Sequence, residues 1–361
     1  MSNPNDFPEP PSKRVPYVRL GNSGLKVSKV ILGCMTYGAE WADWLLDEEE
    51  AIKHIKYAYD AGIQTFDTAP TYSNGLSEII LGKAIKQLNL PREELVIMTK
   101  FGPVVSRVRS EKIRDTRKAD LEGYVNQWGC SRKAIFASVR NSLKRLQLDY
   151  IDVLQCARLL ASTTLIICMI ALHDLVKEGL VRYIGMSSCY TWEFHVLQRG
   201  ITDYAITHNL TPFISMQNHH SLIYREEERE MFPTLKHFGV AAIPWSSLGR
   251  GLLCRPYSKH NSTKRSESDW FLPSYGSDIA LQTIVNRVEE ISKKRGISMA
   301  QVTLAWEFSK DVVAAPIIGT TNLANLKDII GEHFWGLDVK LTKEEIEYLE
   351  EPYRPMNIIG H

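Results

Sequence analysis

The chain has 361 residues, of which 44% are hydrophobic and 24% are charged, as is ordinary for a globular protein with a buried core. Its formal net charge of +1 gives no overall field that would recruit nucleic acid or an acidic membrane. The six cysteines are widely spread and show no paired spacing, which argues against a disulfide framework or a zinc site and favours a reducing compartment such as the cytoplasm. We therefore expect neither a metal ion nor nucleic acid as a partner.

The two ends of the chain and its most apolar run are the next features. Residues 1–16 contain too many prolines and too few apolar residues for a signal peptide, and they predict a disordered tail. The uncharged run at 165–172 is shorter than the roughly 20 residues that a membrane-spanning helix needs. Residues 341–361 are expected to form a terminal helix and tail. We predict no membrane partner.

Between these ends, short apolar runs alternate with amphipathic stretches. Residues 17–33 predict a small hairpin that turns at 22–24 and leads into the first strand. Near-continuous apolar character is typical of strands that are covered on both faces of a parallel sheet. The predicted strands are 27–33, 64–69, 95–100, 151–156, 182–188, 214–220, 240–247 and 314–319. The predicted helices are 47–62, capped by Asp47, 131–147, capped by Ser131, 225–239, broken near Pro233, 282–296 and 300–309.

Eight strands, each followed by helix over about 300 residues, predict a (β/α)8 TIM barrel at residues 17–340. A doubly wound sheet is the rival fold, but LGCMTYG after the first strand is not the Gly-rich fingerprint of that fold. Two long connections, 102–130 and 249–279, would lie at the C-terminal rim of a barrel, where active sites are built.

Three polar residues at strand ends would meet at this rim. Asp67 ends the second strand, Tyr72 follows it, and Lys100 ends the third. An adjacent ammonium stabilises a phenolate and so lowers the pKa of the tyrosine, and a carboxylate would hold that ammonium in place. Such a tyrosine can give a proton to a carbonyl oxygen while hydride arrives at the carbon. Each residue alone also has a structural explanation, because Asp67 could cap a turn and Lys100 could form a rim salt bridge.

Several sequence blocks around these residues form a recognisable set: FDTAPTYSNGLSEIILGKAI, VIMTKFG, SLKRLQLDYIDVLQ and IPWSSLGRGLL. In order and spacing they resemble the aldo-keto reductases over about residues 17–340, most nearly the branch with aryl-alcohol dehydrogenases and versiconal hemiacetal acetate reductases. The resemblance implies a (β/α)8 barrel, NADP(H) bound across the rim and no metal. It makes Tyr72 the general acid, Lys100 the residue that tunes its pKa, and Asp67 the partner of Lys100.

The same resemblance implies a set of cofactor-binding residues along the rim. Ser187, Ser188 and Gln217 would hold the nicotinamide amide, and Trp245 would stack under the ring, although it could equally be a core aromatic. The remaining cofactor positions are Thr36, Asp67, then Ser246, Leu248 and Arg250 along the pyrophosphate, and Gly319, Thr321 and Asn325 at the adenosine end. Neutral residues stand in GTTNLANLKD where the family carries cations for the 2′-phosphate, so Arg250 or a basic residue of 249–279 is expected to serve instead.

One departure from the family pattern lies at the end of the fourth strand. The chain reads DVLQCARLL, so that Ala157 stands where the family has a histidine. Alanine offers no donor to a substrate carbonyl, and loss of one such donor typically costs about 3 kcal/mol of barrier. His219 or His220 could substitute for it, or both could be ordinary residues of the rim. Ala157 is also unremarkable if the protein no longer reduces carbonyls.

A second departure follows in the next helix. At 100° per residue, Leu165, Cys168, Met169, Leu172, Leu175 and Val176 share the face that packs on the barrel. Ile166, Ile167 and Ile170 fall on the opposite face, where they would form an exposed apolar patch. A partner surface such as a homodimer interface, genetic decay of an inactive copy, and an error of reading frame all account for this.

The leading hypothesis is an NADP(H)-dependent oxidoreductase that reduces an aldehyde or ketone of aromatic or polyketide-like character, with activity reduced by Ala157. The long connections contain Tyr124, Trp128, Trp270, Phe271 and Tyr275 as candidate walls for such a substrate. The rival hypothesis is a catalytically weakened NADPH-binding regulatory or scaffold protein. An unrelated barrel enzyme is a third.

Overall fold

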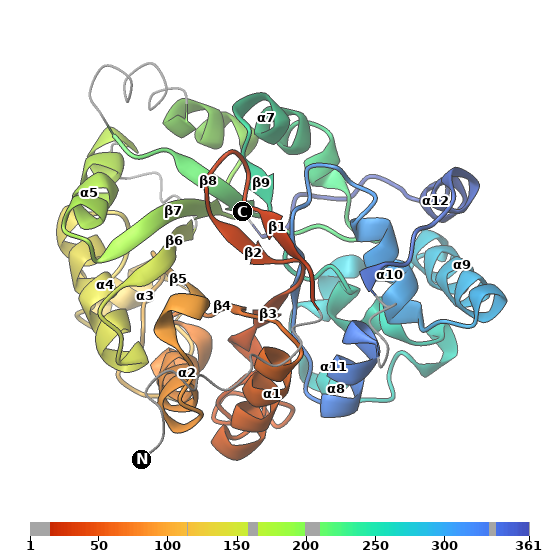
Figure 1. Cartoon of the computed structure of the whole chain (residues 1–361), viewed down its shortest axis with the longest axis horizontal. Coiled ribbons are helices and arrows are strands. Elements are labelled where there is room, and N and C mark those ends of the chain that lie inside the picture. Colours follow the sequence, from red (N-terminus) through yellow and green to blue (C-terminus); the bar gives the residue numbers. More distant parts are fainter. Residues whose placement is uncertain (1–14, 114, 158–164, 199–209, 332–336, 361) are drawn as a thin grey trace, which may run out of the picture.

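The computed structural model describes residues 15–113, 115–157, 165–198, 210–331 and 337–360. Eight parallel strands form one sheet in the order β10-β3-β4-β5-β6-β7-β8-β9, visible as a ring in Figure 1. The two ends of this order are joined by hydrogen bonds from Ala242 N to Val312 O (2.9 Å) and from Ile317 N to Pro244 O (2.8 Å). The sheet therefore closes on itself, and the predicted (β/α)8 barrel is confirmed.

Each of the eight predicted strand segments overlaps a barrel strand, and four of the strands extend one residue beyond the predicted bounds. The strands are β3 (Ile31–Gly33), β4 (Thr65–Asp67), β5 (Val96–Phe101), β6 (Ile151–Ala157), β7 (Val181–Ser187), β8 (Phe213–Gln217), β9 (Ala241–Ala242) and β10 (Ile317–Ile318). The first prediction, 27–33, was wrong as a single strand. Residues up to Ser28 belong to β2 (Lys26–Ser28), which pairs antiparallel with β1 (Tyr17–Arg19) in the predicted hairpin. A bend at Lys29 and Val30 separates β2, which pairs with β1 in the hairpin, from β3, which pairs with β4 and β10 in the barrel wall.

The hairpin closes the N-terminal end of the barrel. Its buried Leu20 and Val27 pack with Met98, Val153 and Ile243 from the interior of the sheet. These apolar contacts fill the lower part of the barrel. The polar residues of the strands are thereby left to gather at the opposite, C-terminal end.

Helices cover the outside of the ring, as Figure 1 shows. They are α1 (Glu48–Asp60), α2 (Leu76–Gln87), α3 (Thr116–Leu121), α4 (Arg132–Leu146), α5 (Leu165–Lys177), α7 (Met231–Phe238), α8 (Lys264–Ser268), α9 (Ile279–Arg295), α10 (Met299–Glu307), α11 (Leu323–Ile330) and α12 (Lys343–Glu350). Both predicted caps are present, since the side chains of Asp47 and Ser131 accept from Glu50 N and Ala134 N. Pro233 is the third residue of α7, where its missing N–H removes no helical bond.

For the α5 residues whose side chains are described, the structure shows the predicted buried face and the predicted exposed face. Cys168, Met169 and Leu172 are buried against the barrel, whereas Ile167 and Ile170 are 51% and 40% exposed. The side chains of residues 165 and 166 lie outside the described part, as do the tail at 1–14 and the segment 158–164. The outward isoleucines are therefore a real surface feature of this helix.

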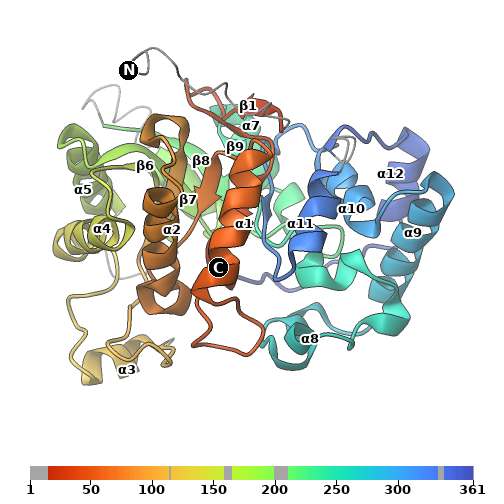
Figure 2. The same ribbon diagram turned by 60° about the horizontal axis from the view of Figure 1, so that its bottom comes forward.

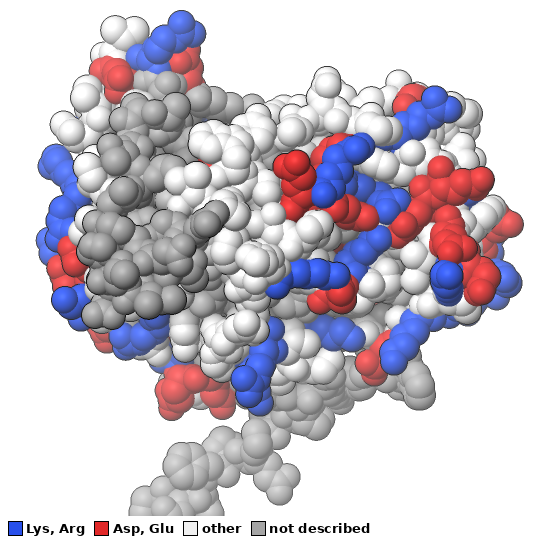
Figure 3. All heavy atoms as spheres, turned by 90° about the horizontal axis from the view of Figure 1, so that it is seen from above, with Lys and Arg blue, Asp and Glu red and all other residues white. Residues whose placement is uncertain are grey.

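The long connections lie at the rim, as predicted. Figure 2 shows α3 and α8, which belong to 102–130 and 249–279, at the end of the barrel opposite the hairpin. Within the described ranges, no helix combines the length and apolarity that crossing a bilayer requires. On the face in Figure 3, basic and acidic side chains are interspersed, consistent with the near-zero net charge.

The close approach of α2 and α4 gives a stability test. A Cβ added at Gly82 would lie 2.3 Å from the carbonyl oxygen of Leu146. Gly82→Ala should therefore lower the free energy of unfolding by about 1–3 kcal/mol through overpacking, despite the better helix propensity of alanine. Gly24→Ala is the control, because no atom lies within 4 Å of its added Cβ. Urea denaturation measures both; equal stabilities would contradict this packing.

Candidate active site

A cavity of about 1010 Å³ opens at the C-terminal rim. Its wall combines strand ends with the loops after β3, β5 and β9. It contains every residue predicted for catalysis or cofactor binding, together with Ala157: Thr36, Asp67, Tyr72, Lys100, Ser187, Ser188, Gln217, Trp245, Ser246, Leu248, Arg250, Gly319, Thr321 and Asn325. Residues that lie up to 289 positions apart in the sequence thus share one pocket because the strands are parallel.

The centre of the pocket floor is a buried ion pair. Lys100 Nζ donates to Asp67 Oδ1 at 2.8 Å and to Oδ2 at 2.7 Å, and also to the carbonyl oxygen of Thr68 at 2.9 Å. The two side chains are 8% and 2% exposed. These three oxygen acceptors match the three N–H groups of the ammonium, and they hold the ammonium next to the phenol of Tyr72.

Two glutamine amides complete the shell of Asp67. Gln155 Nε2 and Gln217 Nε2 each donate to Asp67 Oδ1 at 2.8 Å, and Gln217 Nε2 lies 2.6 Å from Gln155 Oε1. Gln155 was not predicted, although a polar residue within the apolar run 151–156 is a signal that the sequence offers. Together these donors fix the carboxylate in orientation.

Tyr72 lies directly after β4, at the start of a 3-10 turn (Tyr72–Gly75). Lys100 Nζ lies 5.1 Å from the centre of its ring. The lowered pKa that the sequence predicted for Tyr72 was wrong, because burial raises the pKa of the phenol by more than the Lys100 ammonium lowers it. Burial also lowers the pKa of Lys100, but Asp67 and Tyr72 raise it by more, so the pKa of Lys100 lies above its ordinary value. At neutral pH the pair is a neutral phenol beside a cation.

The neighbouring strand ends carry hydrogen-bonding groups. Ser187 Oγ donates to Gln217 O at 2.9 Å, and Ser188 N donates to Asn218 Oδ1 at 2.8 Å. Ser188 has a φ of 55°, a strained conformation for serine that Asn218 holds in place. Asn218, which was not predicted, is a positioning residue for this loop.

Trp245 lies in the pocket wall with its ring packed on His219. The two rings are stacked at 4.3 Å between centroids, and His219 Nε2 is hydrogen-bonded with Tyr275 Oη at 2.8 Å. His220 is fully buried and is bonded to Glu307 and Glu228. Neither His219 nor His220 lines the pocket, so neither is placed to serve as a donor beside Ala157.

Cations gather at the far end of the pocket. Arg250 Nε and Arg265 Nε both donate to Asp269 Oδ2 at 2.9 Å. Lys264 and Arg255 also line the cavity beside Thr321 and Asn325. For Lys264, no carboxylate partner is found among the described residues. Sequence reasoning expected a basic residue of 249–279 here without identifying which one.

The substrate side of the pocket is aromatic in part. Of the five aromatic residues proposed as walls, Trp128, Trp270 and Phe271 line the cavity, whereas Tyr124 and Tyr275 are buried elsewhere. Trp41 and Trp44, from the loop after β3, also line it and were not anticipated.

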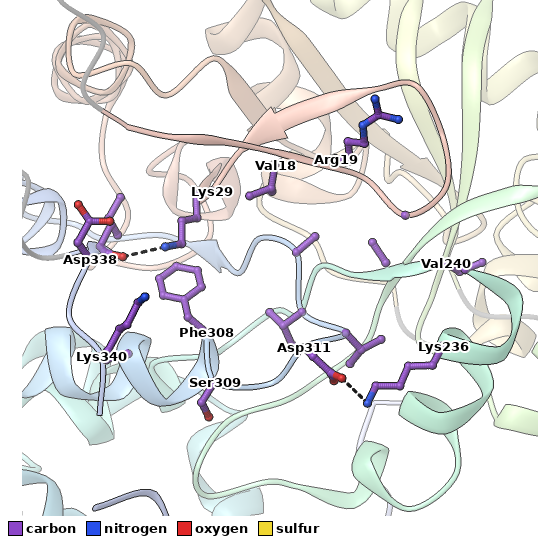
Figure 4. A pocket seen from close by; sticks show the side chains of 18 of the residues that line it. Val18, Arg19, Lys29, Lys236, Val240, Phe308, Ser309, Asp311, Asp338 and Lys340 are labelled. Atoms are coloured by element: carbon purple, nitrogen blue, oxygen red, sulfur yellow. Dashed lines mark hydrogen bonds and ion pairs between the residues drawn. The ribbon is translucent and has the colours of Figure 1, made fainter. Parts of the chain in front are cut away.

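A second hollow of about 690 Å³ lies at the hairpin end (Figure 4). Lys29 Nζ donates to Leu337 O at 2.9 Å, and Lys236 pairs with Asp311 at 2.5 Å. Two cations of this hollow therefore bind to groups of the protein itself. The residues predicted for catalysis lie at the opposite end of the barrel.

The barrel and its pocket define an oxidoreductase of carbonyl compounds. The family model described as "Aldo/keto reductase family" matches residues 29–354, so the chain belongs to the aldo-keto reductase family. It is 48% identical to a versiconal hemiacetal acetate reductase of Aspergillus parasiticus over 348 residues, covering 95% of this chain and 98% of that one. It is 45% identical to a candidate aryl-alcohol dehydrogenase of Schizosaccharomyces pombe, covering 95% and 97%. The branch named from sequence is thus confirmed.

The buried ion pair of Asp67 and Lys100 predicts how three variants change the free energy of unfolding. Asp67→Asn leaves the Lys100 ammonium buried without its counter-charge, which should cost about 3–5 kcal/mol of unfolding free energy. Asp67→Asn combined with Lys100→Met removes both charges and should recover most of that loss. Lys56→Met breaks the surface pair with Asp60 (side chains 57% and 48% exposed) and should cost less than about 1 kcal/mol. Denaturant titration distinguishes these cases; a double variant as unstable as Asp67→Asn would contradict the pairing.

Proposed function

We propose that this protein is an NADP(H)-dependent reductase of aldehydes or ketones, with Tyr72 as the general acid. The observation that carries the proposal is the Lys100 ammonium, fixed by Asp67 at 2.7 and 2.8 Å and placed beside the Tyr72 ring inside a deep pocket. A bound nicotinamide supplies hydride at this rim.

The residues present fit such a dinucleotide. The Ser187 hydroxyl and the Gln217 amide suit a carboxamide, and the Trp245 ring offers a flat apolar face. Gly319 lets the backbone come close, because a Cβ there would lie only 3.1 Å from Gly33 O. At the far end, Lys264, Arg255 and Arg265 suit a terminal phosphate, which favours NADP(H) over NAD(H).

The proton chemistry follows from the pKa directions. Tyr72 stays protonated at neutral pH because its pKa is raised, so the phenol is available as a donor. As the proton moves to the carbonyl oxygen, negative charge develops on the tyrosine oxygen. Lys100 is already in place and charged, and it stabilises that charge without reorganisation. Asp67, Gln155 and Gln217 act by keeping Lys100 in position.

We infer the substrate class from the aromatic residues that line the pocket. Trp41, Trp128 and Trp270 suit a flat aromatic or polyketide-like carbonyl compound. The names of the relatives, which include a versiconal hemiacetal acetate reductase, point the same way. None of the six cysteines forms a disulfide, which suits the cytoplasm.

Tyr72→Phe tests the acid role. Mixing the variant with NADPH and an aromatic aldehyde should give a rate of NADPH oxidation lower than wild type by about 10²–10⁴. Tyr348→Phe, on the exposed helix α12, is the control and should leave the rate unchanged. In wild type the reduction rate should stay level from pH 6 to 9 and fall only as pH rises through the raised pKa of Tyr72. An undiminished rate for Tyr72→Phe would overturn the mechanism.

Ala157→His tests the proposed impairment. Ala157 is the last residue of β6 and borders the cavity, so a histidine there could donate to the substrate oxygen. We expect kcat/KM to rise by up to a few hundredfold, equivalent to about 3 kcal/mol of barrier. Ala157→Phe adds a ring without a donor and should give no gain. Equal rates for Ala157→His and wild type across a panel of carbonyls would refute the impairment.

The same site supports a second candidate function because Ala157 lacks the donor. A protein that binds NADPH tightly but turns it over slowly could act as a regulatory or scaffold subunit, with Ile167 and Ile170 as part of a contact surface for a second copy. Tight NADPH binding in fluorescence titration with no turnover of any carbonyl by wild type or Ala157→His would favour this function.

A further inference from the structure

Three cysteines that are far apart in the sequence meet behind the sheet. Cys130 directly precedes Ser131, the cap of α4; Cys156 is in β6; and Cys168 is in α5. Their Sγ atoms all lie within 4.8 Å of one another, and each residue is at most 2% exposed. Sequence spacing gave no indication of this cluster, because the fold alone brings the three elements together.

The cluster is separate from the pocket. Successive residues of a strand point to opposite faces, so Cys156 points away from the cavity that Ala157 lines. All three cysteines belong to the largest hydrophobic cluster of the described residues. A hydrogen bond with Cys130 is the largest cause that raises the pKa of both Cys156 and Cys168. The three sulfur atoms therefore interact with one another.

The spacing suits one atom bound to three sulfurs. Three atoms within 4.8 Å of one another have a common centre no more than about 2.8 Å from each, whereas a bond from a soft metal to a thiolate is about 2.3 Å. Inward movement of each sulfur by no more than about half an ångström closes that difference. Among the described residues no fourth ligand joins the three, so the tetrahedral set of four that structural zinc prefers is not formed by them.

The charge of the three thiolates indicates which kind of atom the cluster could bind. Three thiolates carry three negative charges, so a monovalent or divalent ion would leave a net charge buried in the core, which is costly. A trivalent soft atom gives a neutral product. We propose that Cys130, Cys156 and Cys168 form a buried site for trivalent arsenic or antimony. This site is independent of the carbonyl reductase function.

The reaction balances without any redox partner. Arsenous acid condenses with three thiols: three As–O and three S–H bonds break, and three As–S bonds form. The released hydroxyls and protons leave as three water molecules, and arsenic stays trivalent. Because the thiols are buried, binding requires local opening between β6, α4 and α5 and is expected to be slow. Once formed, the product cross-links these three elements and should raise the melting temperature.

Arsenite titration of the reduced wild-type chain is the first test. Native mass spectrometry should find one arsenic bound with loss of three hydrogens. A thiol count on the denatured complex should fall from the six cysteines of the chain to half that number. Protection of only two thiols, or binding of several arsenic atoms, would overturn the proposal, and neither measurement depends on a variant that must fold.

Single variants then identify the ligands. Cys130→Ala, Cys156→Ala and Cys168→Ala should each abolish the three-thiol product, with folding checked by circular dichroism and Cys156→Val as a second, better-packed variant. Cys254→Ala is the control, since Cys254 is free and lies outside the cluster. Unchanged binding by Cys156→Ala, or tighter binding of Cd²⁺ than of arsenite to the same three cysteines, would contradict the charge argument.

Discussion

The buried pair between Asp67 and Lys100 is the interaction on which the candidate site depends. Two charges with exposures of 8% and 2% are stable in a protein interior only when each is fully hydrogen-bonded. Here the ammonium has three oxygen acceptors, and the carboxylate also receives the amides of Gln155 and Gln217. These side chains come from β4, β5, β6 and β8, and the curled parallel sheet brings them together at one end.

Side chains along β6 alternate between the two sides of the sheet. Gln155 points inward to the carboxylate, whereas Cys156 points outward to the helices and Ala157 again borders the pocket. The ion pair is complete with alanine at position 157, because its hydrogen-bonding partners come from other residues. On the outer face of α5, Ile167 and Ile170 are exposed.

Much of the fold and of the site could be predicted because both depend on local patterns. Apolar runs marked all eight strands, and the residues that follow them line one cavity. The split between β2 and β3 was missed because the two strands are separated by only two residues and differ in their pairing partners, which lie far away in the sequence. Gln155, Trp41 and the cysteine cluster were missed because their roles arise from contacts between distant elements. The raised pKa of Tyr72 likewise depends on burial, which the sequence does not reveal.

The central claim is that Lys100 serves the proton donor and not the binding of the dinucleotide. Single-turnover oxidation of NADPH by excess enzyme with an aromatic aldehyde, compared between wild type and Lys100→Met, tests it most directly. The account predicts a similar Kd for NADPH and a rate constant lower by about 10²–10⁴. A Lys100→Met enzyme that binds NADPH and reduces the aldehyde at the wild-type rate would contradict it.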